Sequence, residues 1–272
     1  MKKNDIKVCI LRVGGTNCDA ETKRSFEELG VQAEIAHANE VARKGNLLEY
    51  SALVIPGGFS YGDYVRAGAI WAKWIVCKMG KELLAFVDDE RPVLGICNGF
   101  QVLVEAGLLP GFAGISEYPE ASLATNVPPG YNCRWVLLKH ENRGKCVFTC
   151  TIPTRKILRM PVAHSEGRFI FPKEKEERLF EKLCENDQLV FSFCSKDGEA
   201  AHGEYPTNPN GSFKDIAGIC NPEGTVFGLM PHPERAFYWW QRPDWTRQPH
   251  ENEYGDGKLV FESLVAFLSK RP

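Results

Sequence analysis

The chain has 272 residues, a net charge of −2 at neutral pH and a hydrophobic fraction of 43%. These values allow a substantial core in one large α/β domain or two small ones, and they give no electrostatic case for binding nucleic acid or an anionic membrane. No apolar run approaches the roughly 20 residues that span a bilayer, and the first residues do not have the pattern of a signal peptide. We therefore expect a globular, cytoplasmic protein.

Ten cysteines are scattered through the chain, mostly within apolar segments, and no pair has Cys-x-x-Cys spacing. In a chain of this size, such a distribution is typical of reduced thiols that fill the core rather than of a disulfide-stapled secreted fold. A structural zinc site is not expected, because its usual paired spacing is missing.

The first half of the chain alternates apolar β-type runs with segments of helical period. The expected strands are 8–13, 31–36, 53–56 and 93–96, and the expected helices are 19–29, 67–87 and one that starts directly after Cys97. This alternation predicts a parallel sheet with helices on both faces. Binding sites in such sheets lie at the carboxyl ends of the strands, where Gly57, Gly58 and Cys97 fall.

The second half differs in character. Two stretches, 111–133 and 203–215, are rich in turn-forming residues and are expected to be loops. The expected elements are strands at 135–139, 147–151 and 189–193, a charged helix at 173–184, a hairpin of 216–220 with 226–230, and a C-terminal helix at 257–268. They predict a mixed or antiparallel extension of the sheet. Because no linker or repeat separates the halves, we expect one domain over residues 1–272.

Cys97 has the local sequence of a nucleophile elbow. A short apolar run leads into it, Gly95 precedes it by two residues, Gly99 follows it by two, and a helical pattern starts at once. The glycines permit close packing around a residue at the tip of a strand–turn–helix, and the helix N-terminus favours a thiolate. The alternative is a buried thiol in a tight turn.

A second motif supplies the expected base. His232 stands between two prolines at the end of the run 226–230, and Glu234 follows two residues later. The prolines stiffen the loop, and the carboxylate can accept a hydrogen bond from the imidazole and so fix its tautomer. We expect a Cys97–His232–Glu234 triad, with a rigid surface turn as the alternative for the second motif.

The oxyanion of an acyl-transfer reaction needs N–H donors. Asn98, directly after the nucleophile at the helix start, is the first expected donor. The second is expected from Gly58 and Phe59 in the glycine-containing segment 56–63. A plain turn or a phosphate-cradling loop is the alternative for this segment, although it lacks the Gly-Lys-Ser/Thr of a phosphate loop.

The segments 95–101 and 231–234 resemble the motifs of class I, triad-type glutamine amidotransferases. Three further segments, 12–19, 56–64 and 161–169, are similar to those of the family in this class that serves purine biosynthesis. The Gly-Phe-Ser-Tyr-Gly-Asp and Val-Ala-His-x-Glu-Gly-Arg-Phe patterns within them are more selective than the shared triad motifs. Together these segments extend over most of the chain.

The resemblance implies a flavodoxin-like, doubly wound, mainly parallel sheet with an antiparallel extension. It implies that Cys97 attacks the side-chain amide of glutamine and releases ammonia, that Gln101 helps to bind this substrate, and that His164 lies in a wall of the pocket. It also implies a separate synthetase subunit that uses ATP and Mg²⁺ to turn the ammonia and formylglycinamide ribonucleotide into the amidine, and a small third subunit. No cofactor is expected in this chain.

Two departures from the family pattern stand out. Gly14 and Gly15 replace a common Pro-Gly, and the chain is longer than the compact form of such subunits, partly through the aromatic segment 237–245. That segment is either a partner-docking surface, since Trp and Tyr are enriched at interfaces, or a cap on its own domain. Cys18 lies in a family motif without an elbow and is expected to be structural or to line an interface.

Three rival functions stay open from the sequence. Another biosynthetic amidotransferase would share the triad but lack the Gly-Phe-Ser-Tyr-Gly-Asp segment. A DJ-1-type cysteine hydrolase would have an elbow cysteine without His232 and Glu234. A regulatory subunit with an inactive site would not need the complete triad.

Overall fold

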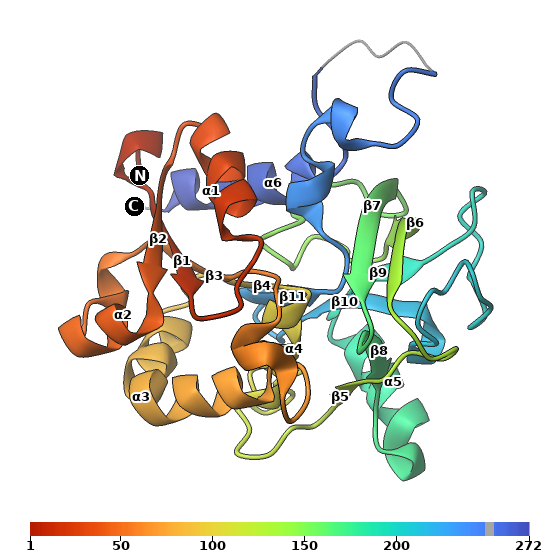
Figure 1. Cartoon of the computed structure of the whole chain (residues 1–272), viewed down its shortest axis with the longest axis horizontal. Coiled ribbons are helices and arrows are strands. Elements are labelled where there is room, and N and C mark those ends of the chain that lie inside the picture. The colour runs from red at the N-terminus through yellow and green to blue at the C-terminus, as the bar shows by residue number, and fades with distance from the viewer. Residues whose placement is uncertain (248–252, 272) are drawn as a thin grey trace.

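The structure is a computed structural model that describes residues 1–247 and 253–271 (Figure 1). A mixed sheet of nine strands runs through this part of the chain in the order β2-β1-β3-β4-β11-β10-β9-β6-β7. The first five strands are parallel, and the last four continue the sheet in antiparallel pairing. The parallel half has the 2-1-3-4-5 strand order of a flavodoxin-like fold, as expected.

The strands of the sheet have short, well-defined bounds. From one edge to the other they are β2 (Gln32–His37), β1 (Lys7–Arg12), β3 (Ala52–Ile55), β4 (Val93–Ile96), β11 (Val226–Leu229), β10 (Ile216–Cys220), β9 (Leu189–Phe193), β6 (Asn132–His140) and β7 (Ile157–His164). A separate antiparallel pair joins β5 (Ser122–Ala124) to β8 (Arg168–Ile170).

Helices cover both faces of the parallel half. They are α1 (Asp19–Glu28), α2 (Ala38–Lys44), α3 (Ala69–Asp88), α4 (Asn98–Glu105) and α6 (Lys258–Lys270), whereas α5 (Glu176–Glu185) lies next to β8, away from the parallel strands (Figure 1). In Figure 1, α1 and α6 lie above the parallel strands, whereas α3 and α4 lie below them. This doubly wound arrangement explains why β3, β4 and β11 are buried at every position and read as continuous apolar runs.

Burial changes along the sheet with the pairing. Strand β7 alternates half-buried and buried residues over its whole length, because only one of its faces packs on the core. Strand β11 is the junction, since it pairs parallel with β4 and antiparallel with β10. The carboxyl ends of β3, β4 and β11 therefore meet at one edge beside the antiparallel extension.

Most expected elements are confirmed within a few residues, but one strand is wrong. Residues 147–151 form turns, in which Thr149 donates its amide to Cys146 and Ile152 donates to Thr149. Phe148 is fully buried and packs against Phe227 at 5.7 Å between ring centroids. The apolar character of this segment therefore serves packing rather than strand pairing.

Other elements were not expected. The strand β5 and the first residues of β6 lie inside the stretch predicted as loop, and β7 and the short helix α2 were missed. Helix α2 is capped by the His37 side chain, which accepts from the Asn39 amide, and it ends at Gly45 with a φ of +63°. Among the described residues, no helix combines the length and apolar character that crossing a bilayer requires.

Candidate active site

Cys97 lies at the tip of the turn between β4 and α4, in a strained backbone conformation. Its φ is +51° and its ψ −103°, which few non-glycine residues adopt. A Cβ atom on Gly99 would lie 1.8 Å from the Ile55 carbonyl oxygen, so only glycine fits there. The elbow predicted from the sequence is present. The Cys97 side chain is nearly buried, and Sγ lies 3.7 Å from the Ala163 carbonyl oxygen of β7.

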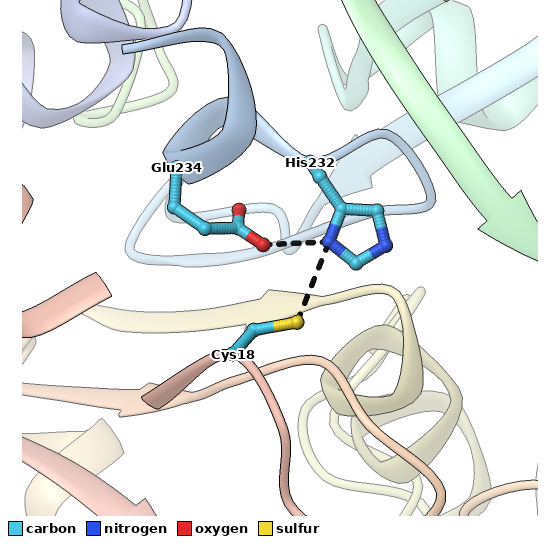
Figure 2. A group of neighbouring side chains, drawn as sticks. All are labelled: Cys18, His232 and Glu234. Atoms are coloured by element: carbon cyan, nitrogen blue, oxygen red, sulfur yellow. Dashed lines mark hydrogen bonds and ion pairs between the residues drawn. The ribbon is translucent and has the colours of Figure 1, made fainter. Parts of the chain in front are cut away.

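His232 and Glu234 form a buried pair at the end of β11. The His232 amide is anchored to the Pro161 carbonyl of β7 at 2.8 Å. Its Nδ1 lies 2.6 Å from Oε1 of Glu234, as Figure 2 shows, and both side chains are at most 2% exposed. Nε2 has no hydrogen-bond partner among the described residues, so it is the nitrogen left to exchange a proton.

The surroundings strengthen His232 as a base. Burial lowers its pKa, but Glu234 and then Cys97 raise it, and the net pKa lies well above the ordinary 6.5. Cys97 is thus near enough to the imidazole to influence its pKa. The structure therefore brings together all three residues of the triad expected from the sequence.

Cys18 lies next to His232. It precedes α1, it is 1% exposed, and its Sγ lies 3.9 Å from Nδ1 of His232 (Figure 2). The same sulfur lies 3.1 Å from Nη2 of Arg235. Cys18 was expected to be structural or to line an interface, and the structure adds that its thiol contacts His232 of the candidate site. The sequence signal was its place in a family motif at a strand end.

The side chains of Cys18, His232 and Glu234 offer ligand atoms within 4.8 Å of one another, as a metal site would require. Two contacts oppose a cation there. Glu234 already shares a proton with His232 in a short hydrogen bond, and the Arg235 guanidinium lies against the Cys18 sulfur. These side chains are better suited to proton transfer than to metal binding.

The loop after β3 leaves one amide for an oxyanion. Phe59 donates its amide to the Gly15 carbonyl at 2.8 Å, so it is engaged in this conformation and does not meet the expectation for it. Gly58 faces Thr16 in an antiparallel bridge as a pair that exchanges no hydrogen bond, because the bonds of this bridge join the neighbouring residues, so the Gly58 N–H points away from Thr16. The donors left are Gly58 and Asn98, the latter at the start of α4.

The same loop explains the unusual Gly14-Gly15 pair. Gly15 has a φ of +92°, and a Cβ atom there would lie 2.1 Å from the Phe59 carbonyl oxygen. Gly14 has no positive φ, and a Cβ atom there would meet nothing within 4 Å. The departure from Pro-Gly therefore falls on the tolerant position, and the required glycine is retained.

Gln101 lies one helical turn after Cys97 and is held in place at both ends of its amide. Its Nε2 donates to the Glu166 carbonyl at 2.6 Å, and its Oε1 accepts from Asn98 at 3.0 Å. His164 lies in the expected wall of the substrate pocket. Its Nδ1 contacts Oδ1 of Asn126, and burial lowers its pKa to about 3. His164 is therefore neutral and acts as a spacer in the wall rather than as an acid or base.

Two carboxylates lie near this wall: Asp63, which the sequence reasoning missed, and Glu166, which belongs to the segment 164–167 that the resemblance places in the wall. Burial, followed by the charge of Glu166, raises the pKa of Asp63 to about 6. Glu166 accepts a hydrogen bond from the Ala67 amide, and Asn98 approaches Asp63 at 3.5 Å. Both residues belong to motifs singled out in the sequence, which was the signal available.

The aromatic segment 237–245 is buried at its first residue and partly exposed at its tryptophans. Phe237 is fully buried against Phe261, and Tyr238 stacks on Trp240 at 4.4 Å, whereas Trp240 and Trp245 are almost half exposed. Tyr238 and Trp240 line a cavity of about 710 Å³ together with residues of α1. The segment therefore caps its own domain at Phe237 and leaves two indoles at the surface.

Comparison with known proteins identifies close relatives. A CobB/CobQ-like glutamine amidotransferase domain matches residues 5–268. The chain is 45% identical over 280 residues to phosphoribosylformylglycinamidine synthase subunit PurQ of Archaeoglobus fulgidus, covering 99% of this chain and all of the relative. It is 40% identical over 275 residues to the subunit of that name from Methanothrix thermoacetophila, covering 98% of this chain and 99% of the relative.

Solved structures agree. A chain in the structure of PurLQS from Thermotoga maritima matches with a TM-score of 0.72 and 30% identity over 97% of this chain and 99% of that one. A glutamine amidotransferase from Thermotoga maritima matches with a TM-score of 0.51 and 17% identity over 98% of this chain and 100% of that one, which shows a shared fold alone.

Proposed function

The chain belongs to the CobB/CobQ-like glutamine amidotransferases and, among them, to the PurQ subunits of phosphoribosylformylglycinamidine synthase, and we propose that it releases ammonia from glutamine through Cys97, His232 and Glu234. The observation that carries this assignment is the 2.6 Å contact of His232 Nδ1 with Glu234, which leaves Nε2 without a partner on an imidazole whose pKa Cys97 raises. Another biosynthetic amidotransferase and a DJ-1-type hydrolase lose their basis, since the relatives of 40–45% identity over nearly the whole chain are PurQ subunits.

The reaction begins with proton transfer from the Cys97 thiol to Nε2 of His232. The sulfur forms a bond to the amide carbon of the glutamine side chain, and the amide oxygen becomes an oxyanion held by the N–H groups of Gly58 and Asn98. When the C–N bond breaks, His232 returns its proton to the leaving nitrogen and ammonia departs. A thioester remains on Cys97.

Hydrolysis completes the cycle. His232 takes a proton from water, the resulting hydroxide attacks the thioester carbon, and collapse of the second oxyanion releases glutamate and the Cys97 thiol. Glu234 keeps Nδ1 protonated throughout, so that Nε2 is always the atom that exchanges protons. Gln101 and the wall containing His164 and Ala163 would hold the substrate.

The remaining assignments concern the complex. Support for a synthetase partner comes from the solved structure of PurLQS from Thermotoga maritima, one chain of which this chain matches. In our proposal, the ammonia passes to a synthetase subunit that consumes ATP with Mg²⁺, and a small third subunit completes the assembly, while this chain needs no cofactor. We also propose a cytoplasmic location, supported by ten free thiols, and one domain, supported by the sheet that joins both halves.

The decisive experiment separates the two half-reactions. In the complex reconstituted with the cognate synthetase subunit, Cys97→Ala should abolish glutamine-dependent amidine formation and leave ammonia-dependent formation intact. A mutant complex that still uses glutamine would show that Cys97 is not the nucleophile. We further expect the isolated chain to be a weak glutaminase that the synthetase subunit stimulates.

A further inference from the structure

Arg235 lies beside the catalytic pair but is bound elsewhere. It follows Glu234 directly in the chain, yet its Nε pairs with Oε1 of Glu21 on α1 at 2.9 Å. Its Nη2 donates to the Cys18 sulfur at 3.1 Å. Among the ion pairs of the described residues, none joins Arg235 to Glu234. The guanidinium is thus tied to the start of α1 by two contacts.

Glu234 is nevertheless an attractive partner for this guanidinium. Burial lowers the pKa of Arg235, while Cys18, Glu21 and Glu234 all raise it, so Glu234 is near enough to attract the cation. Oε2 of Glu234 is buried and makes no hydrogen bond within the described part of the chain. A guanidinium can engage a carboxylate through two parallel N–H bonds, which a single imidazole N–H cannot match.

A direct Arg235–Glu234 pair would damage the triad. It would neutralise the carboxylate that orients His232 and stabilises its protonated form. We propose that Cys18, together with Glu21, is a positioning residue that holds Arg235 away from Glu234, so that the carboxylate stays with His232. This inference rests on the proposed triad and adds a part to it.

A thiol suits this position because it contacts both neighbours without adding charge. Burial raises the pKa of Cys18 to about 11, so the group is a neutral thiol at physiological pH. Its sulfur lies between Nη2 of Arg235 and Nδ1 of His232. An alanine would remove both the acceptor and the bulk that separates the guanidinium from the catalytic pair.

The test is a double-mutant cycle in the reconstituted complex. We expect Cys18→Ala to lower kcat with glutamine about tenfold, with little change in KM. When Arg235→Gln is already present, Cys18→Ala should lower kcat less than about twofold, because no guanidinium then competes for Glu234. Glu21→Gln removes the other contact of Arg235, so it should also lower kcat with glutamine. Glu27→Gln, which removes an exposed pair with Lys23 on the same helix, is the control.

A second readout follows the imidazole itself. In NMR titrations, the pKa of His232 should fall in Cys18→Ala and rise again in the double variant. The titratable or charged groups that face His232 come from several elements and are Cys18, Cys97, Tyr131, His164, Glu234 and Arg235. Cys18 itself raises the pKa of His232, and this contribution is lost in both variants, so the recovery in the double variant reports Arg235 alone.

Two results would overturn the proposal. An equal loss of kcat in both backgrounds would mean that Cys18 acts by packing alone, and an unchanged kcat would mean that it positions nothing. Circular dichroism and assembly with the synthetase subunit monitor folding in each variant. If Cys18→Ala does not fold, the same cycle is run with Glu21→Gln and Arg235→Gln. Failure here leaves the triad itself untouched, which Cys97→Ala tests separately.

Discussion

The parallel and antiparallel halves of the sheet contribute different parts of the active site. Strands β3 and β4 end in tight turns that present Gly58 and Cys97, which we propose to bind the oxyanion and to act as the nucleophile. The antiparallel half supplies walls and anchors, because β7 contributes His164 and binds the His232 backbone through Pro161. The comparison teaches that strand ends place reactive atoms, while the extension fixes their neighbours.

His232 belongs to both halves. It follows β11, the strand that pairs parallel on one side and antiparallel on the other. Its imidazole is therefore positioned against Cys97 by the register of the parallel strands and held by β7 of the extension. Substitutions that affect only one half should separate reactivity from stability.

The largest effect on activity is expected from Glu234→Gln. The amide can present its NH₂ group to Nδ1 and favour the wrong tautomer, so kcat with glutamine should fall by about 100-fold or more. The pKa of His232 should also fall, since Glu234 raises it. Steady-state kinetics and an NMR titration of His232 check both effects, and a pKa that stays above 6.5 would contradict the pairing.

The next effect concerns the elbow of the parallel half. Gly99→Ala forces a Cβ atom to within 1.8 Å of the Ile55 carbonyl oxygen, so β3 and α4 must separate. We expect a loss of about 2–3 kcal/mol in the free energy of unfolding and a large loss of glutaminase activity, measured by urea unfolding and ammonia release.

Gly80→Ala is the matched control. Gly80 lies within α3, and a Cβ atom there meets nothing within 4 Å. Alanine should raise the free energy of unfolding by about 0.5–1 kcal/mol, because it favours the helix. Equal destabilisation by both substitutions would mean that the close approach at the elbow has no special role.

A third substitution should lower the stability of the fold while leaving the reaction rate nearly unchanged. Phe148 is fully buried outside the parallel half, in the turn segment predicted as a strand. Phe148→Leu should cost about 1–2 kcal/mol of unfolding free energy through a partly filled cavity, with kcat changed by less than about twofold. A large fall in kcat at full occupancy of the folded state would show that this packing reaches the triad.

The same division governs what could be predicted from sequence. In the parallel half, buried strands read as continuous apolar runs with glycine at their ends, so the elbow at Cys97 and the loop at Gly58 were evident. In the other half, Phe148 was misread because its apolar segment has strand composition but turns on itself. Strand β7 was missed because Pro161 and half-buried residues interrupt its apolar pattern.

The site was predictable to a similar depth. Cys97, His232 and Glu234 each lie in a recognisable local motif, and their meeting follows from strand ends at one edge. The engagement of the Phe59 amide by Gly15 and the proximity of Cys18 to His232 depend on contacts between segments far apart in the chain. Such contacts leave no local pattern, so only the structure could reveal them.

The smallest effect is expected from Asp63→Asn, which tests the loop of the parallel half through its pH dependence. Asp63 has a φ of +52°, which Asn tolerates, and its folded pKa of about 6 lies above the ordinary 3.8. The folded state therefore binds this proton more tightly than the unfolded state, so wild-type stability falls as the pH rises from about 4 to 6. Asp63→Asn removes this loss. Its melting temperature should exceed that of the wild type at pH 7, and the difference should shrink as the pH is lowered towards 4. A difference that is constant across this range would show that the Asp63 carboxyl does not titrate as its burial and the charge of Glu166 require.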